Sequence, residues 1–165
     1  MSHFENYQHV SRFYDNTRTA VGVDIIRNQL QNGELPINKQ LLVDAGCGTG
    51  LYSAALVKNV RKIEAIDLNA GMLKIAKEKM KLEGKNGLIN FHISSIDSLP
   101  LDNDTADAVM INQVLHHLPD NLTRGWTHHE KVFREFWRVL KSGGMLIINS
   151  CSPEQIESGF WFYHL

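Results

Sequence analysis

Short apolar runs alternate along the chain with longer stretches of helical periodicity. The short runs are rich in β-branched residues, and several are apolar at successive positions, as strands buried on both faces of a sheet would be. These runs are Leu41–Val43, Ile63–Ile66, Leu88–Ile93, Ala106–Ile111 and Met145–Ile148. The pattern therefore predicts five buried strands.

Helices are predicted between these strands and before the first one. The expected spans are Thr19–Asn32 ended by Gly33, Thr49–Asn59, a segment from the N-cap Asn69 to Gly84, and Trp126–Lys141 closed by Gly143 and Gly144. Strands that alternate with helices through short connections form right-handed βαβ units. We therefore predict an α/β fold with an open, Rossmann-like parallel sheet and helices on both faces.

The composition is that of a globular protein. The chain has 165 residues, of which 43% are hydrophobic and 21% charged, and we expect one domain over residues 1–165. Its formal net charge of -1 gives no reason to expect nucleic acid or an anionic membrane as partner. No signal peptide or membrane-length apolar run is recognised, so the cytoplasm is the expected compartment.

The most informative stretch is LLVDAGCGTGLYSAAL, from Leu41 to Leu56. A buried strand ends at Asp44, and glycines follow at every second position, as Gly46, Gly48 and Gly50. Glycine lets the backbone turn sharply and lets a ligand approach without a Cβ in the way. The N-terminus of the helix that follows suits a carboxylate or a phosphate. This arrangement predicts a loop that binds a nucleotide-type ligand.

Asp67 ends the second predicted strand, seventeen residues after Gly50. An acidic residue about 20 positions beyond such a loop, at that strand's tip, suits the two hydroxyls of a ribose. The alternative is that Asp67 helps to cap the next helix. The dinucleotide fingerprint GxGxxG needs a glycine where Leu51 stands, so the spacing favours a ligand without a pyrophosphate.

The ordered segments VDAGCGTG, AIDLN, SSIDSLPL, ADAVMINQVLHHLPD and RVLKSGGMLIIN resemble the motif set of class I S-adenosylmethionine-dependent methyltransferases, over about residues 39–150. The resemblance implies S-adenosyl-L-methionine as cofactor, S-adenosyl-L-homocysteine as product and a small-molecule methyl acceptor. The cofactor-binding residues it implies are Asp44, Gly46, Cys47, Gly48 and Gly50 for the methionine part, Asp67 for the ribose, Leu68, Ile96 and Asp97 for the adenine, and Asn112 and Gln113 beside the methyl-transfer site.

Each polar assignment has a structural alternative. Asp44 has the alternative role of satisfying loop amides, Asp97 that of an ordinary turn or N-cap residue, and Asn112 that of capping the short helix that contains Leu115. In small-molecule members of the family, a lid helix precedes the first motif, and FYDNTR resembles it. Tyr14 and Arg18 would then close over the methionine end, with a solvent-facing helix as the alternative.

The paired histidines His116–His117 and His128–His129 invite a metal assignment. We expect no metal site, because adjacent helical residues point apart and no carboxylate or cysteine at i+3 or i+4 completes a ligand set. His116, His117 and Tyr14 are the candidate catalytic groups, although packing is the simpler role for the two histidines. Two cysteines without a CxxC pair predict neither a disulfide framework nor structural zinc.

The resemblance implies the strand order 3-2-1-4-5. Family members continue with a helix and an antiparallel strand pair, which are missing here after Met145–Ile148. We therefore expect lid helices in residues 1–38, a cofactor-binding core in 39–150 and a truncated tail in 151–165. The fifth strand would be an exposed edge, covered by a homodimer contact or by the tail from Phe160 to Tyr163.

Three functions are compatible with this sequence. The first is a methyltransferase that acts on a small molecule by direct in-line transfer. The second is a cofactor-binding but inactive module, which the short C-terminal part favours. The third is an NAD-dependent oxidoreductase, which Leu51 disfavours.

Overall fold

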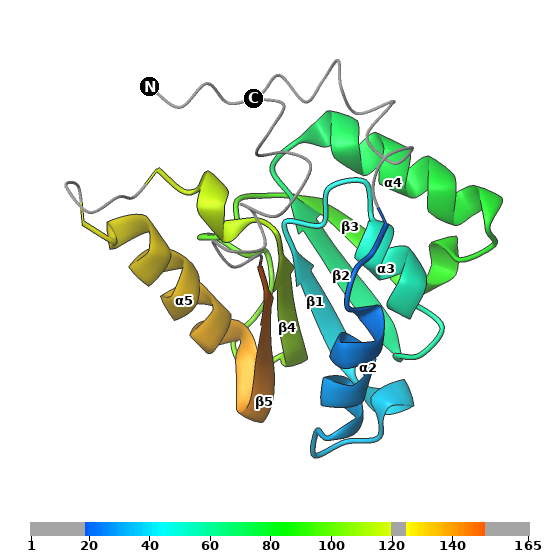
Figure 1. Cartoon of the computed structure of the whole chain (residues 1–165), viewed down its shortest axis with the longest axis horizontal. Helices are drawn as coiled ribbons and strands as arrows, with labels where there is room; N and C mark the ends of the chain where they lie inside the picture. The colour runs from blue at the N-terminus through cyan, green and yellow to red at the C-terminus, as the bar shows by residue number, and fades with distance from the viewer. Residues whose placement is uncertain (1–18, 120–124, 151–165) are drawn as a thin grey trace, which may run out of the picture.

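Five strands form one parallel sheet in the order β3-β2-β1-β4-β5 in the computed structural model, which describes residues 19–119 and 125–150 (Figure 1). The strands are β1 (Leu41–Ala45), β2 (Lys62–Asp67), β3 (Ile89–Ile93), β4 (Ala106–Asn112) and β5 (Leu140–Asn149). Both the Rossmann-like fold class and the predicted strand order are confirmed.

Helices cover both faces of the sheet. Figure 1 shows α2 (Val23–Gln31), α3 (Leu51–Leu56) and α4 (Ala70–Leu82) on one side, and α5 (Thr127–Val139) on the other. Successive strand residues alternate between two apolar cores, so Leu42 and Ile63 pack in the first layer while Val43 and Ile66 pack in the second. No helix among the described residues is long and apolar enough to cross a membrane.

Two of the predicted helices are shorter than expected at their N-termini. Helix α2 begins at Val23 rather than near Thr19, and α3 begins at Leu51 rather than at Thr49. The residue before each helix is a glycine in the left-handed conformation, with φ of 78° at Gly22 and 74° at Gly50. The backbone therefore turns at each glycine before it can enter a right-handed helix. By contrast, Asn69 caps α4 as predicted, since its Oδ1 accepts hydrogen bonds from the amides of Gly71 and Met72.

The glycines at 143 and 144 do not close a helix, so that prediction is wrong. Helix α5 ends at Val139 and β5 begins at once with Leu140. Strand β4 pairs Ala106 with Leu140 and then Ala108 with Met145, so the residues between Leu140 and Met145 form a bulge that contains both glycines.

The strand order places a topological switch point at β1. One connection leads from β1 to β2 on one side, and β4 pairs with β1 on the other. In open α/β sheets, ligands bind beyond the carboxyl ends of the strands at this point. The residues after β1, β2 and β4 are therefore the ones to examine.

Candidate functional site

The three glycines of the loop after β1 serve different purposes. A Cβ on Gly46 would lie 2.6 Å from a methyl carbon of Val114, and one on Gly50 would lie 3.1 Å from the Cβ of Ala76. A Cβ on Gly48 would meet none of the described residues within 4 Å, although its φ is also positive at 53°. Gly46 and Gly50 therefore let the loop pack on its neighbours, whereas Gly48 borders open space where a ligand can approach the backbone.

The loop's amides are used within the protein. Gly46 and Cys47 both donate to the carbonyl of Ile66, at 2.8 and 2.9 Å, and Gly50 donates to Cys47 at 2.9 Å. The amide of Gly48 donates to Oδ2 of Asp67 at 2.7 Å. These bonds fix the loop against the end of β2, and they leave none of these four amides as a free donor for a ligand.

Asp67 lies at the end of β2, as predicted. Its Oδ2 accepts from Gly48, and its Oδ1 accepts from the amide of Asn69 at 2.8 Å. Each carboxylate oxygen has two lone pairs, so both retain one acceptor position for a hydroxyl group. The alternative role as a helix cap is not supported, because the side chain of Asn69 caps α4.

Asp44 is buried at the end of β1, with 2% of its surface exposed. Its Oδ2 accepts a hydrogen bond of 2.6 Å from the hydroxyl of Ser53 on α3, rather than from loop amides. Burial raises the pKa of Asp44 to about 7. The hydrogen bond from Ser53 acts in the opposite direction, and the nearby charge of Asp67 adds to the effect of burial. Among the described residues, neither carboxylate forms an ion pair with a cation.

Cys47 is buried in the loop as a free thiol. Burial, and then the charges of Asp44 and Asp67, raise the pKa of its thiol well above the ordinary range. A thiol that stays protonated is a poor nucleophile. Cys47 therefore contributes packing to the loop rather than covalent chemistry.

Asn112 and Gln113 follow β4 at the same edge of the sheet. Asn112 is 7% exposed, and neither its Nδ2 nor its Oδ1 has a hydrogen-bond partner among the described residues. A buried amide without partners destabilises the fold and is rare unless a ligand or water satisfies it. Gln113 has φ of 55°, an uncommon conformation for a residue other than glycine, and its amide donates to Asn149 at 2.9 Å. Both features are typical of a binding site.

The three residues expected at the adenine lie on the β2 and β3 side. Leu68 is 68% exposed, directly after Asp67, and Ile96 is buried in the core beneath α5. Asp97 is exposed in a turn in which Ser98 donates to the carbonyl of Ser95 at 3.1 Å. Its carboxylate accepts no hydrogen bond from the described residues, so the alternative role as an N-cap is not supported.

His116 and His117 lie in a 3-10 turn, Leu115–His117, after β4. Their rings are 4.0 Å apart between centroids, so the prediction that these neighbours point apart is wrong. His129 packs edge-on against Trp126. Within the described ranges, no three His, Cys, Asp or Glu side chains gather as metal ligands. Tyr14 and Arg18 lie outside the described residues.

Sequence reasoning missed three polar residues that support the site. Ser53 is the buried partner of Asp44, and Glu135 and Arg138 form an ion pair on α5 with N···O of 2.6 Å. The i, i+3 spacing of Glu135 and Arg138 on a predicted helix could have indicated this ion pair. Their partners lie in an irregular loop, however, which no periodicity reveals.

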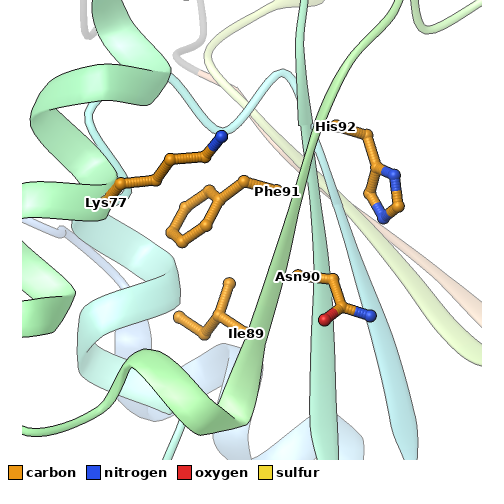
Figure 2. A pocket seen from close by; sticks show the side chains of 5 residues that line it. All are labelled: Lys77, Ile89, Asn90, Phe91 and His92. Atoms are coloured by element: carbon orange, nitrogen blue, oxygen red, sulfur yellow. The ribbon is translucent and has the colours of Figure 1, made fainter.

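A hollow of about 450 Å³ lies elsewhere, along the edge strand β3 (Figure 2). Phe91 and Ile89 point toward α4 in Figure 2, whereas Asn90 and His92 point to the opposite face. Asn90 and His92 both bond to Glu64 of β2, at 2.9 and 2.6 Å. This hollow contains none of the predicted site residues, and its Asn90 and His92 are bonded to Glu64, so it does not compete with the site at the strand ends.

Comparison with known proteins identifies the family. The family model described as "Methyltransferase domain" matches residues 43–148, more than half of the chain. The demethylmenaquinone methyltransferase of Clavibacter sepedonicus is 30% identical over 145 residues, which is 86% of this chain and 55% of that protein. The biotin biosynthesis bifunctional protein BioHC of Teredinibacter turnerae is 30% identical over 71% of this chain and 20% of its own length.

Solved structures agree on the fold. A protein from Methanococcus maripaludis, assigned to the S-adenosyl-L-methionine-dependent methyltransferases, has a TM-score of 0.68 and 25% identity, covering 86% of this chain and 62% of its own. The [4+2]-cyclase SpnF has a TM-score of 0.70 at 20% identity, covering 86% of this chain and 56% of its own. The chain spans between 20% and 61% of the first curated relatives it matches. The chain belongs to the methyltransferase domain family, and the predicted class I fold and S-adenosylmethionine cofactor are confirmed at the level of that family.

Proposed function

We propose that this chain binds S-adenosylmethionine beyond the carboxyl ends of β1, β2 and β4, and that it takes part in methyl transfer to a small organic acceptor. The observation that carries the proposal is the pair of carboxylates, Asp44 and Asp67, that lack a cationic partner within the described residues. The named relatives support a small acceptor, because two of them are a demethylmenaquinone methyltransferase and a biotin biosynthesis protein.

The charge of this site distinguishes between the candidate cofactors. A positively charged ligand is attracted by the carboxylates of Asp44 and Asp67, and its binding favours the ionised form of Asp44. S-adenosylmethionine carries a sulfonium and an ammonium group, whereas NAD would bring a pyrophosphate toward the same carboxylates. The electrostatics therefore add to the argument from Leu51 against a dinucleotide.

The residues fit the cofactor part by part. Gly48 leaves the backbone open to the ligand, Asp67 retains acceptors for two ribose hydroxyls, and exposed Leu68 offers an apolar surface for the adenine. The two unpartnered atoms of Asn112 form a donor and an acceptor for the amino-acid end or the methyl acceptor. In this assignment Asp97 accepts from the adenine amino group.

When bound, the cofactor would supply a methyl group on a positively charged sulfonium, and the group that leaves on methyl transfer is a neutral thioether. The protein's task is then to hold the acceptor in line with that methyl group and to exclude water. A general base is needed only for an acceptor that must lose a proton. His116 and His117 are the described candidates for that role.

The experiment is calorimetric titration with S-adenosylhomocysteine and with NAD. We expect S-adenosylhomocysteine to bind and NAD not to bind.

Asp67→Ala removes hydrogen bonds to a charged acceptor worth about 1.5–3 kcal/mol, so the affinity for S-adenosylhomocysteine should fall roughly 10- to 150-fold. Asp24→Ala, the same change on an exposed residue of α2, is the control. A folded Asp67→Ala variant with the parent's affinity would refute the assignment, and methyl release from a metabolite panel would separate an active enzyme from an inactive module.

We also propose one domain over residues 1–165, with its cofactor-binding core in 39–150, and a homodimer formed through the β5 edge. Strand β5 is the edge strand of the sheet that the described residues form, and Leu146 and Ile148 on it are 38% and 48% exposed. Trp137 on α5, the helix that covers the same face of the sheet, is 83% exposed. Sedimentation velocity tests this: the parent should be a dimer and Leu146→Lys a monomer, while a monomeric parent would refute the contact.

A further inference from the structure

The segment between β3 and β4 carries Ile96 and Asp97 but contains neither helix nor strand. It spans residues 94–105. The backbone groups of an irregular segment need partners outside regular structure if the segment is to keep one conformation. Two side chains of α5, Glu135 and Arg138, supply many of them.

Arg138 uses all five of its N–H groups. Its Nη1 donates to the carbonyl of Leu101 and to Oδ1 of Asn103, both at 2.8 Å, and its Nη2 donates to the carbonyl of Leu99 at 3.1 Å. The other two, on Nε and Nη2, donate to the two carboxylate oxygens of Glu135 at 2.9 and 2.6 Å. A planar guanidinium that is occupied in this way fixes three alternate loop residues relative to α5.

Glu135 extends the contact toward Asp97. Its Oε1 accepts a hydrogen bond of 2.8 Å from the amide of Leu99, two residues beyond Asp97. The hydrogen bond from Arg138 lowers the pKa of Glu135, so the carboxylate stays ionised. Leu99 is therefore held at both its amide and its carbonyl, and its side chain is buried in the core beneath α5.

The other side of Asp97 is also held. Ser98 donates to the carbonyl of Ser95, and the hydroxyl of Ser94 donates to the carbonyl of Ser98 at 2.6 Å. Asp97 thus lies within a closed turn, two residues before the Leu99 that the Glu135–Arg138 pair holds, and Asp97 itself is exposed. The position of that carboxylate depends on both anchors.

We propose that Glu135 and Arg138 are positioning residues that set the cofactor's base specificity. By fixing Leu99, they hold the carboxylate of Asp97 where an exocyclic amino group reaches it, so the site prefers adenine over a base that carries oxygen at that position. The inference rests on the proposed function, since it takes Asp97 as the adenine contact. Neither Glu135 nor Arg138 touches the cofactor.

The test compares two ligands and two arginines. Arg138→Gln breaks the pair, and Arg134→Gln makes the same charge change at an exposed position one turn earlier on α5. The ligands are S-adenosylhomocysteine and its hypoxanthine analogue, in which oxygen replaces the amino group. Arg138→Gln should weaken S-adenosylhomocysteine binding by about 5- to 20-fold and change analogue binding by less than about 2-fold. Arg134→Gln should change neither affinity.

A second measurement needs no ligand and tests the anchor itself. Amide hydrogen exchange at Leu99 should accelerate in Arg138→Gln and in Glu135→Gln, while the amides of β1 and β4 keep the parent's rates. Glu135→Gln is the second variant if Arg138→Gln does not fold. Unchanged exchange at Leu99, unchanged affinity in a folded variant, or an equal loss for both ligands would overturn the proposal.

The two proposals fail in different ways. A parent protein that does not bind S-adenosylhomocysteine refutes the proposed function. Asp97→Asn should reproduce the selective loss for S-adenosylhomocysteine, and if it weakens both ligands equally or neither, the adenine assignment is wrong. If Asp97→Asn is selective and Arg138→Gln is not, only the positioning role is wrong.

Discussion

The two ends of the sheet differ in how their carboxylates are paired. At the amino ends, Asp107 accepts from the amide of Leu41 at 2.7 Å and pairs with Lys141 at 2.7 Å. At the carboxyl ends, Asp44 and Asp67 have no cation among the described residues, and Asn112 has no hydrogen-bond partner. Asp107 thus joins three strands, whereas the two carboxylates at the carboxyl ends accept from neutral donors, and the carboxamide of Asn112 lacks a partner among the described residues.

This difference separates a carboxylate that pairs with a cation within the chain from the two that we propose bind a ligand. A buried group that finds its partners within the chain contributes to stability, and one that does not lowers it. Sequences retain such unfavourable groups where a ligand completes them. The contrast is informative because both ends belong to the same sheet and use the same residue types.

The largest effect we predict to follow from this contrast is a pH dependence carried by Asp44. Its pKa is about 7 in the folded protein against 3.8 for an ordinary aspartate, so between these pH values the folded state holds a proton that the unfolded state has lost. Stability is therefore lost as pH rises from about 4 to about 7. Relative to Asp44→Asn, the parent should lose on the order of 3 kcal/mol of unfolding free energy between pH 5 and pH 8.

Denaturant titrations of both proteins at the two pH values measure this difference. Asp44→Asn keeps the size of the side chain and a carbonyl acceptor for Ser53. Subtracting the unfolding free energy of this variant from that of the parent at each pH removes the contribution of the other titrating groups. If the unfolding free energies of the two proteins depend on pH in the same way, Asp44 is ionised in the folded protein. Burial of its charge then costs less free energy than the comparison of the two ends implies.

The strands of the sheet were predictable because buried parallel strands have a simple pattern, whereas the strand order was implied by the family resemblance. Apolar runs such as Ile63–Ile66 are followed by Asp67, and the polar residue marks the strand end that binds ligands. Helix starts were less predictable, because Gly22 and Gly50 turn the backbone before the helices begin. The sequence does not distinguish a capping glycine from one inside a first turn.

The site was predictable in position but not in detail. Gly46, Gly48 and Gly50 are equivalent in sequence, and only the packing of Val114 and Ala76 separates the two that fit against neighbours from the one that faces open space. The pair Glu135–Arg138 was missed because its partners are backbone groups of a loop without periodicity. Contacts between distant segments determine such roles, and a single sequence does not record them.

A second prediction concerns the amino end. Asp107→Ala leaves the buried amide of Leu41 without an acceptor and removes the partner of Lys141, which should lower the unfolding free energy by about 2 kcal/mol. The dissociation constant for S-adenosylhomocysteine should stay within about 2-fold of the parent's in the folded variant, since the change is at the far end of the sheet. A clear loss of affinity in calorimetry would mean that the two ends are coupled and the division between them is wrong.

The smallest expected effect comes from two asparagines that lie opposite each other. Asn112 and Asn149 are paired in the register of β4 and β5, but Asn149 donates to the carbonyl of Val21 at 3.1 Å and to the hydroxyl of Tyr52 at 3.2 Å, whereas Asn112 has no partner. Replacing each with leucine, of similar size, should therefore change stability in opposite directions. Asn112→Leu should raise the unfolding free energy by about 1 kcal/mol, and Asn149→Leu should lower it by a similar amount.

Thermal and denaturant unfolding measure both changes, and calorimetry with S-adenosylhomocysteine supplies the functional readout. A more stable Asn112→Leu that binds the ligand more weakly would mark Asn112 as a residue retained for binding at the expense of stability. If Asn112→Leu is destabilised as much as Asn149→Leu, its carboxamide is already satisfied in solution. The difference between the two ends of the sheet would then depend on the carboxylates of Asp44 and Asp67 alone.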